Sequence, residues 1–160
     1  HLDLIDACAT HKQTLSVNGQ QIRITVPAGV ENGQTIRIGG HGGPGVNGGP
    51  KGDLYLTFIV KDHPRFKRTG ADLHTTVDLD LYTAVLGGDA VLATLDGTVK
   101  LKVLPGTQNG ERVKLKGKGV PVYRKEGAFG DLYVVYQVKL PTQLTDEQRV
   151  LFEKLKATTH

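Results

Sequence analysis

The residues best suited to chemistry in this chain are a glycine-rich segment, six histidines, two neighbouring carboxylates and a serine. Segment 39–52 could cradle a phosphate, but phosphate loops lead into a helix, and here a strand-like stretch follows. The histidines show no i,i+4 pair and no close i,i+2 pair, so the sequence brings no donors together around a metal. We therefore expect no phosphate loop, no metal site and no cofactor.

The carboxylates and the serine are equally poor candidates for catalysis. Asp78 and Asp80 alternate with Val77 and Leu79, which predicts that both carboxylates face solvent rather than a cleft built for glycoside hydrolysis. Ser16 is the only serine, and it lies in a strand-like stretch rather than in a nucleophile elbow. The sequence therefore favours a binding protein over an enzyme.

The elements that would position any site are repeated along the chain. Residues 33–42 resemble residues 110–119, and the strand-like stretch 52–56 resembles 130–134. The offset is 77 residues for the first pair and 78 for the second. This period is too long for a solenoid and indicates two small domains in tandem.

Composition agrees with such a pair of domains. Hydrophobic residues make up 38% of 160 positions, and 20 basic residues against 16 acidic ones give a net charge of +4. No run of Lys and Arg forms a tail or a stripe. Cys8 is alone, so we expect no internal disulfide and a reducing, cytoplasmic setting. No apolar run approaches the roughly 20 residues of a membrane span. The lack of methionine and the start at His1 suggest a fragment of a longer protein.

Alternating apolar residues predict an all-β fold of two tandem small β-sandwiches with short helices. Asn18-Gly19 and Asp96-Gly97 each separate two alternating runs, which is a strong hairpin signal. Short helical turns are expected at 3–9 and 81–86. The strands are expected around Leu15, Val17, Ile22, Ile24, Val26, Ile36, Ile38, Leu54, Leu56, Phe58, Val77, Leu79, Val91, Val99, Leu101, Val103, Val113, Leu115, Leu132, Val134, Tyr136 and Val138.

The C-terminal segment carries the clearest helical signal. Thr145 can cap the helix, with Gln148 at the capping-box position. The helix either packs on its own domain or joins a partner chain. Its apolar residues are Val150, Leu151, Phe152 and Leu155.

An exposed edge strand could bind an extended peptide through its backbone. Leu15 and Val17, in the first strand of the first hairpin, are the candidates for contacting such a peptide. The alternative is that both are plain core residues.

The chain carries seven short motifs, at 27–30, 52–54, 63–73, 86–89, 94–97, 105–108 and 117–121. Together they resemble the two C-terminal domains of Hsp40 (DnaJ-type) co-chaperones. The chain has one cysteine and runs straight through the place where other members carry a zinc module, so it resembles the zinc-free class, which includes the curved-DNA-binding group. His63-Pro64 is followed by Arg65, so it does not match the His-Pro-Asp triplet of the family's J domain.

The resemblance implies a client-holding module that delivers unfolded polypeptide to Hsp70. It implies domain I at 1–69, domain II at 70–143, and a dimerisation helix and tail at 144–160. The groove for client polypeptide would include Leu15, Val17 and Phe66. Contacts with the acidic Hsp70 tail would come from Lys12, Arg23 and Lys67, and the homodimer would form through Val150, Leu151, Phe152 and Leu155.

Two other functions remain open at the level of sequence. DNA binding is permitted by a pI near 9.2, although the charge is not clustered along the chain. Carbohydrate binding ranks last, because the chain has no Trp and only 6% aromatic residues.

Overall fold

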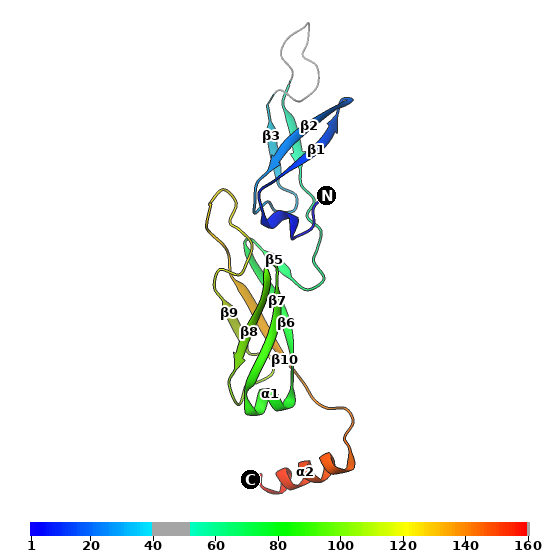
Figure 1. Ribbon diagram of the computed structural model, residues 1–160, viewed down its shortest axis with the longest axis vertical. Helices are drawn as coiled ribbons and strands as arrows, with labels where there is room; N and C mark the ends of the chain where they lie inside the picture. Colours follow the sequence, from blue (N-terminus) through cyan, green and yellow to red (C-terminus); the bar gives the residue numbers. More distant parts are fainter. Residues whose placement is uncertain (40–51, 160) are drawn as a thin grey trace. The chain divides into compact units, whose positions relative to one another are not determined.

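The computed structural model describes residues 1–39 and 52–159 (Figure 1). Most of the glycine-rich segment, with His41, therefore lies outside the described residues, as does His160. Among the residues that are described, no helix is long and apolar enough to cross a membrane.

The chain divides into two compact units. Unit 1 contains residues 1–76, 94–96 and 112–135, and unit 2 contains residues 77–93, 97–111 and 136–160. The predicted all-β character is confirmed, because most elements are short strands in several small sheets.

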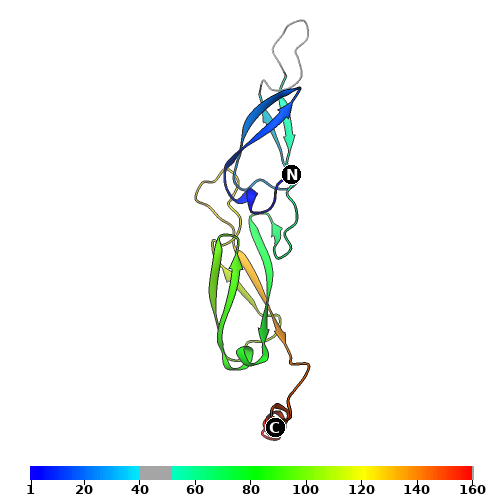
Figure 2. The same cartoon turned by 45° about the vertical axis from the view of Figure 1, so that its right-hand side comes forward.

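Two hairpins build the N-terminal part of unit 1. β1 (His11–Val17) pairs with β2 (Gln20–Val26), and β3 (Thr35–Ile38) pairs with β4 (Leu54–Thr57). The β1–β2 hairpin turns at Asn18 and Gly19, as predicted, and its two blue strands run side by side in Figures 1 and 2. A short 3-10 helix, η1 (Asp6–Cys8), precedes it within the predicted turn 3–9.

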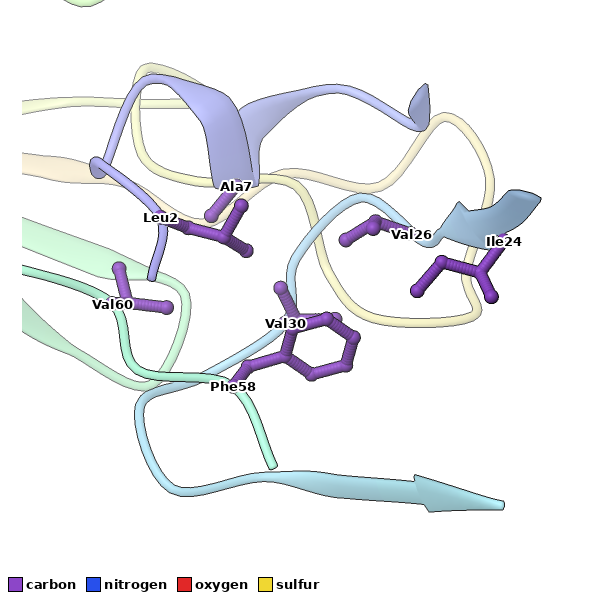
Figure 3. Packing of buried hydrophobic residues seen from close by; sticks show 7 residues of the cluster. All are labelled: Leu2, Ala7, Ile24, Val26, Val30, Phe58 and Val60. Carbon is purple, nitrogen blue, oxygen red and sulfur yellow. The ribbon is translucent and has the colours of Figure 1, made fainter. Parts of the chain in front are cut away.

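These hairpins enclose the core of unit 1. The buried cluster draws on η1, β2 and the segments that flank β3 and β4 (Figure 3). Its members are Leu2, Ala7, Ile24, Val26, Val30, Phe58 and Val60. Burying such side chains is the main source of stability in a unit this small.

A four-stranded sheet has the order β5-β6-β10-β9. Its strands are β5 (Lys67–Thr69), β6 (Asp72–Asp80), β10 (Leu132–Lys139) and β9 (Arg112–Leu115). β5 pairs with β6 and β9 pairs with β10, both antiparallel. Asp78 and Asp80 on β6 are exposed, as the alternation predicts.

Most of a further hairpin and both α-helices lie in unit 2. β7 (Gly88–Thr94) and β8 (Gly97–Val103) form the predicted hairpin at Asp96-Gly97. Helix α1 (Leu81–Leu86) begins after Asp80, whose carboxylate accepts a hydrogen bond from the Thr83 backbone. Helix α2 (Asp146–Ala157) begins after Thr145 with the predicted capping box.

The two copies of the repeat make equivalent hydrogen bonds. The Val60 amide donates to the side chain of Asn32 at 3.0 Å, and the Val138 amide donates to the side chain of Asn109 at 2.9 Å. The Gly29 amide donates to the Ala7 carbonyl, and the Gly106 amide donates in the same way to Ala84. The Phe58 amide donates to the Gln34 carbonyl, and the Tyr136 amide donates in the same way to Glu111. The sequence repeat therefore reflects repeated local structure.

Candidate functional site

The β1 strand has an unpaired edge among the described residues, because its sheet contains only β1 and β2. The turn between them has positive φ at Asn18 (49°) and Gly19 (78°), as a two-residue hairpin requires. In such a hairpin the flanking residues, Val17 and Gln20, direct their backbone groups toward each other, and the direction then alternates along β1. The residues whose backbone groups point away from β2 are Lys12, Thr14 and Ser16.

The side chains of Leu15 and Val17 lie on the inner face of the same hairpin. Both are half-buried, whereas Thr14, just before Leu15, and Ser16, between the two, are exposed. Leu15 is paired with Ile22 and packs against the buried core cluster. Leu15 therefore contributes to the core while part of its surface stays accessible. A core role and a contact with a bound peptide are compatible for this residue.

Phe66 lies in a different part of unit 1, at the floor of an open cavity of about 580 Å³. The floor is apolar, because Leu4, Val60 and Phe66 line it and each is buried. The Phe66 ring is only 3% exposed and lies 5.1 Å from the His63 ring, centroid to centroid. The Arg65 guanidinium lies 5.5 Å from the same ring, in a cation–π arrangement.

The rim of this cavity carries charge of both signs. Its positive residues are Lys61, Lys67 and Arg68, and its negative residues are Glu31 and Asp62. An apolar floor with a slightly cationic rim suits an apolar side chain with a neighbouring carboxylate. Leu15 and Val17 are not among the described residues that line this cavity, so the three predicted groove residues occupy two places in unit 1.

Arg68 forms the wall of the cavity, and sequence reasoning missed it. Its guanidinium donates to the carbonyl oxygens of Val30 at 2.6 Å, Gly29 at 2.8 Å and Gly70 at 2.7 Å. Burial lowers the pKa of Arg68, and the nearby Glu31 carboxylate acts in the opposite direction. No local sequence signal links Arg68 to a turn so far away in the chain, so periodicity could not reveal it.

Comparison with known proteins identifies the family of this chain. The family model of the DnaJ C-terminal domain matches residues 2–141. The chain belongs to this family. The matched residues include the β1–β2, β3–β4 and β7–β8 hairpins and the cavity at Phe66, whereas α2 lies beyond them.

Curated relatives carry the same family name. A chaperone protein DnaJ of Caldicellulosiruptor saccharolyticus is 42% identical over 154 residues, which is 96% of this chain and 40% of the relative. One from Bartonella quintana is 42% identical over 155 residues, 96% of this chain and 41% of the relative. One from Geobacillus kaustophilus is 48% identical over 143 residues, 88% of this chain and 37% of the relative. The chain therefore spans about two fifths of the length of these relatives.

The three cations predicted to contact an acidic Hsp70 tail lie in two places. Lys12 and Arg23 are exposed on the outer face of the β1–β2 hairpin, where Lys12 opposes Thr25 and Arg23 opposes Thr14. That face is opposite to the one that carries Leu15. Lys67 instead lines the cavity beside Phe66.

The apolar residues of α2 are largely uncovered. Val150, Leu151 and Leu155 are exposed, and no residue of the helix is buried. Phe152 is half-buried and lies 6.5 Å from the Tyr82 ring of α1, centroid to centroid. Tyr82, Leu151, Phe152 and Leu155 line an apolar groove of about 450 Å³.

The described residues contain no group of three or more His, Cys, Asp or Glu side chains that could hold a metal ion. The predicted site residues lie at three features, which are the β1 hairpin, the cavity at Phe66 and the apolar face of α2.

Proposed function

We propose that this chain holds unfolded polypeptide as the client-binding part of an Hsp40 co-chaperone. The client adds as an extended strand to the free edge of β1 and bonds to the backbone of Lys12, Thr14 and Ser16. Alternate client side chains then lie on the same face as Leu15 and Val17. Backbone pairing is independent of sequence, which suits a protein that binds many clients.

The observation that carries this proposal is that one strand, β1, has both an open edge and half-buried apolar side chains. Leu15 and Val17 are half-buried, and no described strand covers the other edge of β1. The cavity floored by Phe66 would take a larger apolar side chain elsewhere along the client. Lys67, with Lys12 and Arg23, would attract acidic residues of a client or of the Hsp70 tail.

Membership of the family supports a wider role. The chain would deliver clients to Hsp70 in the cytoplasm, with domain I at 1–69 and domain II at 70–143. The segment 144–160 would form a homodimer, in which two client grooves gain from a high effective concentration. The exposed apolar residues of α2 support this last step.

A pair of proline substitutions tests the edge. Thr14→Pro removes a backbone donor that points away from β2, so the hairpin ladder is kept while an added strand loses a partner. Thr25→Pro makes the matched change on the outer edge of β2. We expect Thr14→Pro to reduce suppression of client aggregation and Thr25→Pro to leave it unchanged. Equal suppression by both correctly folded variants would exclude strand addition at β1.

A further inference from the structure

The second copy of the repeat has an open edge of its own, at β9. In the order β5-β6-β10-β9, β9 has a neighbour on one side only among the described residues. The Tyr136 amide of β10 donates to Glu111, just before β9, so Tyr136 faces β9 with its backbone groups. The backbone groups of Val134 also point toward β9, because the direction of these groups alternates along a strand. Val134 opposes Val113, so Arg112 and Lys114 direct their backbone groups away from β10, toward the open edge.

The same two residues present positive charge. Arg112 and Lys114 are exposed, whereas Val113 and Leu115 are half-buried on the other face. Lys116 and Lys118 continue the alternation into the following turn and are also exposed. The sequence predicted no stripe of Lys and Arg, but the two-residue period of β9 places Arg112 and Lys114 on one face of the strand. With Lys116 and Lys118 in the turn, these residues form a basic stripe. The stripe thus became visible only with the strand.

Acidic groups near the stripe compensate it only in part. Lys114 Nζ lies 3.4 Å from the Asp131 carboxylate, and Lys118 Nζ lies 3.9 Å from that of Asp96. The described residues provide no ion pair for Arg112. Asp131 is also engaged by the Gly117 amide, at 2.9 Å. Excess positive charge therefore remains at the edge.

The first copy lacks this combination. The residues equivalent to Arg112 and Lys114, by the offset of 77, are Thr35 and Arg37 on β3. Thr35 is hydrogen-bonded to Thr57 at 2.9 Å, and Arg37 lies 3.6 Å from Asp53. The positive edge is thus specific to the second copy, which makes Arg37 a matched control.

The charge selects the occupant of this edge. A second copy of β9 would bring Arg112 and Lys114 against cations of the same sign, and like charges across a strand pair are unfavourable. An extended peptide that pairs with Arg112 and Lys114 places its directly opposed residues, two positions apart, on the same face as the cations. Carboxylates at those positions give the favourable cross-strand pairs.

We propose that the open edge of β9 binds an extended acidic peptide with carboxylates at alternate positions, by strand addition opposite Arg112 and Lys114. This site lies on β9 and shares no residue with the proposed client edge on β1. It therefore stands or falls independently of client holding.

Fluorescence anisotropy with a labelled octapeptide of alternating Glu and Thr tests the proposal on the whole chain. Arg112→Glu with Lys114→Glu should weaken binding by about tenfold, because two modest attractions become repulsions. Arg37→Glu should change it by less than about twofold. A peptide of the same composition, with its four Glu residues followed by its four Thr residues, should bind more weakly than the alternating one. Unchanged affinity of the double variant, or equal affinity for both peptides, overturns the proposal.

A second measurement uses the unaltered chain, so it does not depend on the variants folding. Hydrogen exchange at the amides of Arg112 and Lys114 should slow when the alternating peptide binds. In antiparallel addition the residues opposed to Arg112 and Lys114 direct their amides at β9. N-methylation of these two Glu residues should therefore abolish binding, whereas N-methylation of the intervening Thr residues should not. Unaltered exchange would mean attraction without strand addition and would overturn the proposal. Equal binding of an oligothymidylate with the same dependence on Arg112 and Lys114 would overturn the choice of a peptide.

Discussion

The Arg68 guanidinium donates a hydrogen bond of 2.6 Å to the carbonyl oxygen of Val30, which is 38 positions earlier in the chain. A second bond to Gly29 fixes the same turn, so one side chain joins β5 to the loop after β2. Arg68 also lines the cavity at Phe66. The geometry of the candidate site therefore depends on a residue that need not touch the client.

Replacing Arg68 should destabilise unit 1. Arg68→Met keeps the aliphatic stem but leaves the carbonyl oxygens of Val30, Gly29 and Gly70 without this donor. Losing charged donors at half-buried acceptors should cost about 3 kcal/mol in the free energy of unfolding. Urea denaturation measures the loss, and Arg23→Met, at an exposed position on β2, should change it by less than about 0.5 kcal/mol. Similar losses in the two variants would contradict the role given to Arg68.

The turn that Arg68 holds should tolerate no side chain at Gly29. Its φ is +88°, and a Cβ atom there would collide with the backbone of Pro121 and Tyr123. Gly33 has a similar φ of +82°, but a Cβ atom there meets open space. Gly33→Ala should therefore cost only the conformational strain, about 1 kcal/mol. Gly29→Ala should cost clearly more by thermal or urea unfolding, and equal costs would show that the close approach is unimportant.

Local patterns in the sequence predicted the local structure well. Asn18-Gly19 and Asp96-Gly97 form the predicted hairpins, and Thr145 caps α2 with Gln148 as expected. Each of these signals depends on neighbours within four residues, where backbone geometry is set by residue type. The order of the four-stranded sheet and the bonds of Arg68 join residues far apart, which periodicity does not encode.

At the predicted site, too, local structure could be predicted from the sequence and contacts between distant residues could not. Alternation correctly placed Leu15 and Val17 on one face of β1, but it could not say whether Phe66 lies beside them. The structure places Phe66 with Leu4 and Val60 in the cavity. Leu4 and Val60 were missed because both lie outside the named strands, where alternation assigns no buried face. The roles of the predicted groove residues stay predictions.

Client holding should depend on the apolar surface of β1. Val17→Asp places a carboxylate on the face that an added client strand would share with Val17. We expect roughly a fivefold weaker affinity for an apolar peptide, which corresponds to the loss of about 1 kcal/mol of apolar contact. Val91→Asp is the control, because Val91 is exposed on β7 in unit 2. If both variants bind a labelled apolar peptide alike, Val17 does not belong to the client site.

Self-association should depend on α2. Leu151→Glu with Leu155→Glu puts charge on its exposed apolar face and should convert a dimer to a monomer of 17.2 kDa by light scattering. Deletion of 145–160 should have the same effect. Arg149→Ala on the same helix should leave the dimer intact. A wild-type chain that is monomeric at high micromolar concentration would remove the dimerisation role.

Acid stability should report the cap of α1. The backbone and side chain of Thr83 donate to the Asp80 carboxylate at 2.8 and 2.9 Å, and these bonds lower the pKa of Asp80. An aspartate with a lowered pKa in the folded state adds stability above its unfolded value of about 3.9, and this contribution is lost as the pH falls through the folded pKa. The urea midpoint of the wild type should therefore exceed that of Asp80→Asn near neutral pH, and the gap should shrink below about pH 4. Asp78→Asn, at an exposed site for which the described residues offer no hydrogen bond, should track the wild type throughout. A gap that persisted unchanged at low pH would show that the charge on Asp80 does not stabilise the cap.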